Sequence, residues 1–167
     1  MNMTTPNSLM LNDFRIEKSL LPVTVTLVDG QTLVGDVFIQ ASARHRFEME
    51  DATEVMNAAE CFFPLRLSTG PALLVSKAQV RDVSVAAEHA SQPEWSVVVP
   101  TPVRIQLVDG SAFEGKLCLE AKMGNARVLD HLNRSAGRFL ALYRNDDLLL
   151  VAMSQIVVVR QLIDATA

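Results

Sequence analysis

The feature that most limits what this chain can fold into is an internal repeat. The segment from Pro22 to Gly35 aligns with the segment from Pro102 to Gly115 at a constant offset of 80, with 7 identical residues in 14 positions. A second block, 73–83, aligns with 149–159 at an offset of 76, with 5 identities in 11. Matching ends around a middle of variable length indicate one fold used twice. The sequence therefore predicts two copies of one small domain in tandem.

The repeat also sets the expected domain boundaries. These are an N-terminal segment at 1–21, a first repeat at 22–85, a linker at 86–101, a second repeat at 102–162 and a tail at 163–167. Each repeat has only about 60 residues, and a domain of that size buries only about 60% of its unfolded surface. We therefore expect the two repeats to pack on each other or on a second chain.

Each repeat has the pattern of a small β-barrel. Apolar and polar residues alternate along 103–107, which is the period of a half-buried strand. Gly30 and Gly110 each follow an aspartate in a tight-turn signal, because glycine accepts positive φ at no steric cost. Gly35 and Gly115 lie inside the following strand, where glycine often marks a bulge or a sharp bend. The expected fold class is mainly β, with two tandem SH3-like barrels of five or six short strands each.

The segments outside the repeats carry fewer signals. Residues 7–21 mix apolar and charged side chains and predict a short amphipathic helix beginning near Asn12 or Asp13. The linker contains two prolines and the only tryptophan, Trp95. We expect Trp95 to pack the linker onto a barrel, with stacking on a ligand as the alternative.

Two apolar runs do not fit a strand with one buried face. Val97–Val99 and Ile156–Val159 have no polar alternation. A strand that is apolar on both sides must bury both sides, so these runs favour a contact between barrels or between subunits.

Charge and composition exclude several classes of protein. The chain has a net charge of −4, and 49% of its residues are hydrophobic, which indicates a globular protein that is not a general binder of polyanions. The first repeat has five basic and eight acidic residues, and the second has eight basic and six acidic. No apolar run approaches the roughly 20 residues of a membrane span, and residues 1–10 lack the pattern of a secretory signal. The expected location is the cytoplasm, with no membrane partner.

The two cysteines lie in apolar stretches without the spacing of a metal or redox motif. We expect Cys61 and Cys118 to be buried thiols in a reducing compartment, with a disulfide between the repeats as the alternative.

The second repeat resembles the Sm family. Leu107–Gly110, followed by Phe113, Gly115 and Leu117, is similar to the first half of the Sm motif, in which a strand, an Asp-Gly or Asn-Gly turn and a glycine-containing strand open a five-stranded barrel. Residues 126–133, followed by 139–142, resemble short uncharacterised bacterial Sm-like proteins with an R-[LV]-x-D-x-[LM]-N signature. In the first repeat only Met56-Asn57 of that signature is kept.

This resemblance implies tandem Sm-like barrels. Many Sm proteins form rings, and many bind RNA through a basic-glycine turn late in the barrel. Residues 150–155 and 74–79, which match that turn, contain no such pair. RNA binding is therefore an alternative and not the leading function.

The most site-like cluster is Arg127, Asp130 and Asn133. One hypothesis makes it a recognition site for a peptide terminus or a small polar ligand. The other makes it structural, with Asp130 and Asn133 capping a tight turn and Arg127 paired with Asp130. His131 beside it has no nucleophile or orienting partner in any known motif.

Other chemistry is not indicated. The acidic run of 48–54 reads as a solvated face, with a cation site or a basic partner as the alternative. The three histidines and two cysteines have no metal-ligand spacing. No catalytic residue, metal or cofactor is therefore predicted.

The leading hypothesis is a non-enzymatic protein-interaction or scaffolding module of bacterial type that contacts a protein partner or self-associates. The alternatives are an RNA-binding Sm-like protein and a small-ligand sensor, which needs an enclosed pocket between the barrels.

Overall fold

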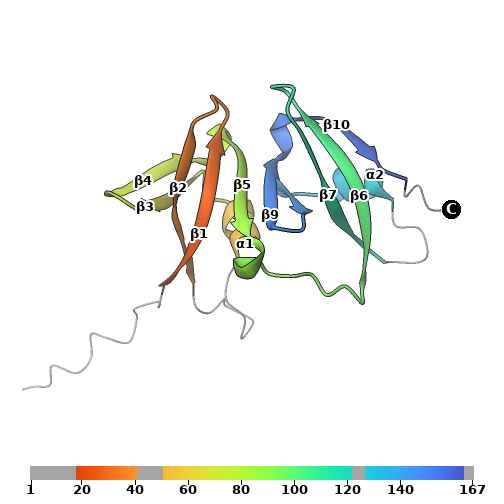
Figure 1. Cartoon of the computed structure of the whole chain (residues 1–167), viewed down its shortest axis with the longest axis horizontal. Helices are drawn as coiled ribbons and strands as arrows, with labels where there is room; N and C mark the ends of the chain where they lie inside the picture. The colour runs from red at the N-terminus through yellow and green to blue at the C-terminus, as the bar shows by residue number, and fades with distance from the viewer. Residues whose placement is uncertain (1–17, 41–50, 122–126, 164–167) are drawn as a thin grey trace, which may run out of the picture.

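The structure is a computed structural model that describes residues 18–40, 51–121 and 127–163 (Figure 1). The N-terminal half contains β1 (Lys18–Leu27), β2 (Thr32–Gln40), α1 (Ala52–Asn57), β3 (Phe62–Leu67), β4 (Ala72–Ser76) and β5 (Val80–Ala86). The C-terminal half contains β6 (Val98–Leu107), β7 (Ala112–Glu120), α2 (Val128–Arg134), β8 (Phe139–Tyr143), β9 (Asp147–Ala152) and β10 (Ile156–Gln161). Short 3-10 turns lie at Lys77–Gln79, Ala87–His89 and Met153–Gln155.

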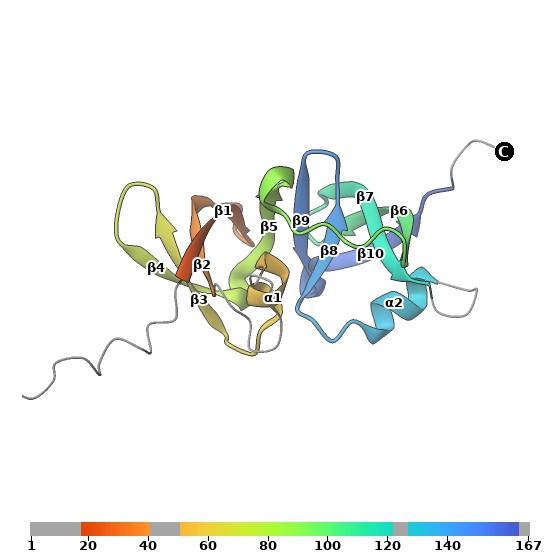
Figure 2. The ribbon, with the colours of Figure 1, turned by 90° about the horizontal axis from the view of Figure 1, so that it is seen from below.

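All ten strands belong to one antiparallel sheet, in the order β10-β6-β7-β8-β9-β5-β1-β2-β3-β4. Each half has the same internal order, with its fifth strand beside its first and its fourth strand at the other end. The halves stand side by side, and β5 lies next to β9 where they meet (Figure 2). The expectation of a mainly β fold is confirmed. The sheet is open, however, because β4 and β10 are its two edges, so closed barrels are not seen among the described residues.

The expected N-terminal helix lies mostly outside the described residues. Its last four positions, Lys18–Leu21, belong to β1 and not to a helix, so that part of the prediction was wrong. These residues pair with the end of β2, and Leu21 is buried in the core, which offsets any helical preference. In the C-terminal half β6 likewise begins at Val98, inside the expected linker.

The two Asp-Gly turns form as predicted. Gly30 has φ 90° and Gly110 has φ 85°, a backbone conformation that favours glycine. The carboxylate of Asp29 accepts a hydrogen bond from the Gln31 amide at 3.0 Å, and Asp109 accepts one from the Ser111 amide at 2.9 Å. Both turns therefore join a first strand to a second strand with the same local chemistry.

The glycines inside β2 and β7 are required for a different reason. Neither has positive φ; instead, neighbouring strands approach their Cα atoms closely. A Cβ on Gly35 would lie 2.3 Å from the Arg66 carbonyl oxygen, and one on Gly115 would lie 2.7 Å from Leu142 Cγ. These glycines allow β3 and β8 to cross onto β2 and β7.

Two helices replace what the sequence pattern suggested were loops. Asp51 caps α1: its carboxylate accepts from the Glu54 amide at 2.9 Å, and Glu54 accepts from the Asp51 amide at 3.2 Å. Two members of the acidic run therefore form a capping box, while Glu48 and Glu50 lie outside the described residues. The segment expected to be a tight turn at 127–133 forms α2.

Candidate functional site

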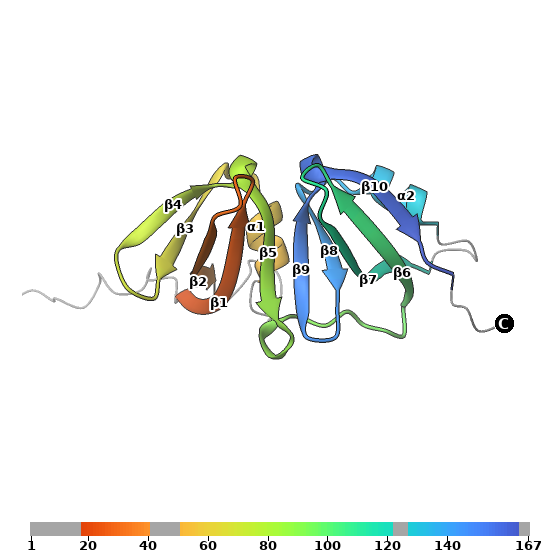
Figure 3. The ribbon, with the colours of Figure 1, turned by 45° about the horizontal axis from the view of Figure 1, so that its top comes forward.

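The junction between the halves is a strand pair. Five residues of β5 pair with five of β9, from Asp82 opposite Val151 to Ala86 opposite Asp147 (Figure 3). The expectation that the two halves associate through extended strands agrees with this pairing. The strands involved differ from those predicted, because Val97–Val99 and Ile156–Val159 take no part in it.

Strand β9 is buried on both faces. Leu148, Leu150 and Ala152 belong to the core of the N-terminal half, together with Phe139 of β8. Leu149 and Val151, which alternate with them, belong to the core of the C-terminal half. One strand therefore completes one core and contributes to the other, so the N-terminal half depends on the C-terminal half for its packing.

A side-chain amide joins the halves beside the strand pair. The Asn57 side chain, at the end of α1, donates from Nδ2 to the Phe139 carbonyl at 3.2 Å and accepts at Oδ1 from the Phe139 amide at 2.9 Å. We call this pair of hydrogen bonds the Asn57 clasp. A Cβ on Gly137 would lie 2.6 Å from Asn57 Oδ1, so the clasp requires glycine at that position.

Arg138 lies next to the clasp. Its guanidinium donates to the carbonyl oxygens of Ala59 and Glu60, each at 3.4 Å, and approaches Cys61 Sγ at 3.6 Å. These hydrogen bonds of Arg138 join the segment before β8 to the segment before β3.

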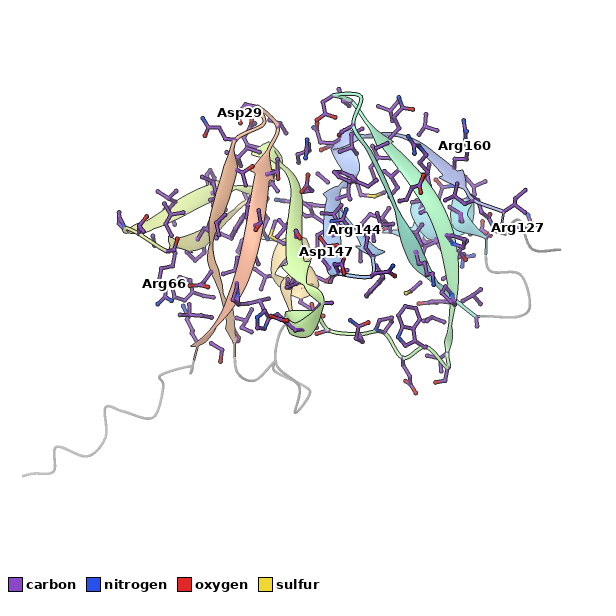
Figure 4. The ribbon with its side chains drawn as sticks, in the orientation of Figure 1. Asp29, Arg66, Arg127, Arg144, Asp147 and Arg160 are labelled. Atoms are coloured by element: carbon purple, nitrogen blue, oxygen red, sulfur yellow. The ribbon has the colours of Figure 1, made fainter. Side chains whose placement is uncertain are left out.

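The outer face of the junction is polar. Ser84 of β5 donates to the Asp147 carboxylate at 2.5 Å, and Arg144 pairs with the same carboxylate (Figure 4). Burial alone would raise the pKa of Asp147, but the hydrogen bonds from Arg144 and Ser84 outweigh it and hold that pKa below its ordinary value. Nearby, Arg81 bridges the halves through Asp109 at 2.9 Å.

An open groove of about 1050 Å³ runs along this outer face. Trp95 and Tyr143 line this groove and contact each other edge to face, with ring centroids 6.0 Å apart. This contact agrees with a packing role for Trp95 on the C-terminal half. Burial raises the pKa of Tyr143 to about 12. The groove is not the enclosed pocket that a small-ligand sensor needs.

The two edge strands of the sheet, β4 and β10, correspond through the repeat to the two junction strands, β9 and β5. The fourth strands β4 and β9 both lead into a 3-10 turn, and the residues before those turns, Ser76 and Ala152, pair with Phe62 and Phe139. Phe62 therefore corresponds to Phe139, and Leu74 corresponds to Leu150. Phe139 and Leu150 are 2% and 0% exposed in the junction, whereas Phe62 and Leu74 are 58% and 76% exposed. We call Phe62 and Leu74 the β3–β4 face.

The opposite edge is also apolar. Strand β10 corresponds to β5 but, among the described residues, pairs with β6 alone, and its residues Val157 and Val158 are 58% and 46% exposed. We call these two residues the β10 edge. The expected burial of this run between the halves is not seen: Ile156 and Val159 pack partly against the core of the C-terminal half, and Val157 and Val158 stay exposed in the single chain.

The residues of the sequence cluster lie at the start of α2 and within it, and α2 packs against β7. Arg127 is the exposed N-cap of α2 and makes no side-chain capping bond, Asp130 is half-buried in the first turn, and Asn133 is exposed. No ion pair joins Arg127 to Asp130 in the described part of the chain, so the expected structural pairing is not seen. Burial lowers the pKa of the neighbouring His131, against a smaller raising effect of Glu120.

Both cysteines are free thiols. Cys118 is half-buried, and burial raises the pKa of its thiol to about 11. Cys61 is exposed, contrary to the expectation of a buried thiol, and lies in the segment that leads into β3.

Within 18–40, 51–121 and 127–163, no three histidine, cysteine or acidic side chains gather as a metal site. No helix in these same ranges is long and apolar enough to cross a membrane.

Comparisons with protein-family models, with curated proteins and with solved structures found no match to this chain.

Proposed function

We propose that this chain is a non-enzymatic protein-interaction module, built from two Sm-like small barrels in tandem, that holds an extended segment of another protein at its β10 edge. One observation carries the proposal. The fifth strand of the N-terminal half pairs with β9 on the side away from β1. In the part of the chain that the structure describes, the corresponding side of β10 carries no strand, and Val157 and Val158 are exposed.

The physical basis is strand addition. An exposed sheet edge presents unpaired backbone amides and carbonyls, which an extended peptide satisfies while its side chains enter neighbouring pockets. The two exposed valines supply apolar surface worth about 25 cal/mol for each Å² buried. The location that we propose for this module is the cytoplasm, as expected from the sequence features described above.

The structure of β9 indicates what the partner segment is like. β9 begins with Asp147, continues with five apolar residues and is the strand that the corresponding β5 edge accepts. Arg160 of β10 and Arg127 are both exposed, and Figure 4 shows them at this far end of the molecule. An extended segment that combines apolar residues with an acidic one fits this surface.

The test uses the chain's own hairpin as the probe. A peptide of residues 137–153, closed by a terminal disulfide so that the hairpin is preformed, carries a fluorophore and is titrated with the full-length protein. We expect a saturable rise in anisotropy, which Val158→Asp abolishes and Leu74→Asp, a change of an equally apolar residue on the opposite edge, leaves intact. Absence of saturable binding up to about 1 mM peptide would overturn the proposal.

A further inference from the structure

We propose that Asn57 and Gly137 form a specificity pair that restricts which hairpin a fifth-strand edge accepts, and that Glu60 withholds the same clasp from a second copy of this chain. The inference rests on the proposed function, since it concerns which partner the β10 edge accepts. It starts from the Asn57 clasp, which the structure allows only because residue 137 has no Cβ.

The free end of the molecule carries the donor of a second clasp. Asn57 and Asn133 each lie six residues after the N-cap of their helix, Asp51 and Arg127 respectively. Asn57 is engaged with Phe139, whereas Asn133 is exposed and no hydrogen bond is seen for its side chain within the described residues. Asn133 is therefore positioned to clasp the first strand of a docking hairpin, at the residue that corresponds to Phe139, while the second strand of that hairpin pairs with β10.

The hairpin of a second copy lacks the matching glycine. The amide of Lys77 donates to the Cys61 carbonyl at 2.9 Å, and the amide of Met153 donates to the Arg138 carbonyl at 2.8 Å, so Cys61 corresponds to Arg138. The preceding residues, Glu60 and Gly137, therefore correspond as well. A Cβ at this position points at the amide oxygen of the clasping asparagine, as the distance of 2.6 Å at Gly137 shows.

The consequence is discrimination between partners. A second copy that docks its β3–β4 face on the β10 edge forgoes both clasp hydrogen bonds, because Glu60 occupies the space that Asn133 needs. A partner with glycine two residues before the first strand of its docking hairpin gains both. Two hydrogen bonds between a side chain and the backbone correspond to a discrimination of about tenfold or more.

The experiment asks whether removing one Cβ creates self-association. Sedimentation velocity is measured on the full-length wild type, on Glu60→Gly and on Glu60→Ala, which removes the charge but keeps the Cβ. We expect Glu60→Gly to self-associate at least about tenfold more tightly than the wild type, Glu60→Ala to match the wild type, and Glu60→Gly with Asn133→Ala to return to it. In the Glu60→Gly protein the Asn133 side-chain amide resonances should shift with concentration.

Equal association of Glu60→Gly and Glu60→Ala, or none in either, would overturn the inference. The proposed function is judged separately, by binding of the hairpin peptide to the wild-type chain. If that peptide binds and its Gly137→Glu version binds equally well, the β10 edge accepts strands but the specificity pair does not exist.

Discussion

At the scale of single residues, glycine has two separate uses in this chain. Gly110 adopts a backbone conformation that other residues avoid, and the preceding Asp109 completes an Asp-Gly pair that predicts a turn. Gly137 has no positive φ and follows no turn motif, and its importance lies in the space it leaves for a side chain 80 positions earlier in the sequence, Asn57. The first use is readable from local sequence, and the second is not, because it depends on a contact between the halves.

The clasp predicts a coupling between two substitutions. Gly137→Ala places a Cβ against Asn57 Oδ1 and should lower the free energy of unfolding by about 2 kcal/mol. In an Asn57→Ala background, where no amide remains to be displaced, the same change should cost less. A double-mutant cycle in urea measures the difference, and strict additivity of the two changes would show that they act independently.

Asp147 predicts a pH dependence. Its pKa in the folded chain is below the ordinary value, so its ionised form stabilises the fold fully above that ordinary value, near 4, and the contribution is lost as pH falls through the folded pKa. Asp147→Asn should cost about 1 kcal/mol at neutral pH, after allowance for solvent screening. The difference in unfolding free energy between the two proteins should shrink as the pH falls below about 4. A difference that stays constant between neutral and strongly acidic pH would contradict the assignment.

At the scale of elements, alternation and turn chemistry predict the strands well and their partners poorly. The Asp-Gly turns and the alternating run of β6 are local signals, and both formed as expected. The helices α1 and α2 were missed because seven residues or fewer carry little periodicity. The apolar run Leu148–Val151 of the junction strand β9 has the same sequence signal as the run in β10. Which of these two runs becomes an interior strand of the sheet depends on pairing between segments that are distant in the sequence. Such pairing cannot be read from the local sequence.

The candidate site was predicted only in outline. Arg127, Asp130 and Asn133 were singled out from one motif, and they lie at α2, in the same half of the molecule as the β10 edge. Asn57 is the residue of the first half that corresponds to Asn133. Its role is visible only in its hydrogen bond to Phe139 of β8. The pairing of Met56-Asn57 with Leu132-Asn133 in the two repeats was the available signal.

The double burial of β9 predicts contrasting effects for two corresponding leucines. Leu150→Ala removes a fully buried side chain from the core of the N-terminal half and should cost about 3 kcal/mol. Leu74→Ala, at the corresponding exposed position, should change stability by no more than about 0.5 kcal/mol. Urea unfolding followed by Trp95 fluorescence and by circular dichroism should give coincident transitions, because the cores share a strand. Two separate transitions would show that the halves fold independently.

At the scale of the whole molecule, the two repeats differ in the sign of their net charge. The residues of the first repeat carry more acidic than basic side chains, and those of the second carry more basic than acidic. The excess on either side is small compared with the six to ten phosphate contacts typical of salt-sensitive nucleic-acid binding. The molecule therefore presents apolar edges with modest charge, which suits a protein partner.

This balance predicts weak binding of RNA. Short single-stranded RNA should not bind the full-length protein with submicromolar affinity near physiological salt. Filter binding at two salt concentrations checks the point. Tight binding that weakens steeply as salt is added would favour the RNA-binding alternative over strand addition.

The shared strand also orders events during synthesis. The N-terminal half ends with β5 at Ala86, but its core needs Leu148, Leu150 and Ala152, which follow only after about 60 further residues. At about 5–20 residues per second, a ribosome takes several seconds to make that stretch. Throughout this interval the nascent chain carries an uncapped core and an open β5 edge. Polysomes that display many such chains at once are thus the place where mispairing between neighbours is most favoured, and the stage at which a chaperone has most to protect.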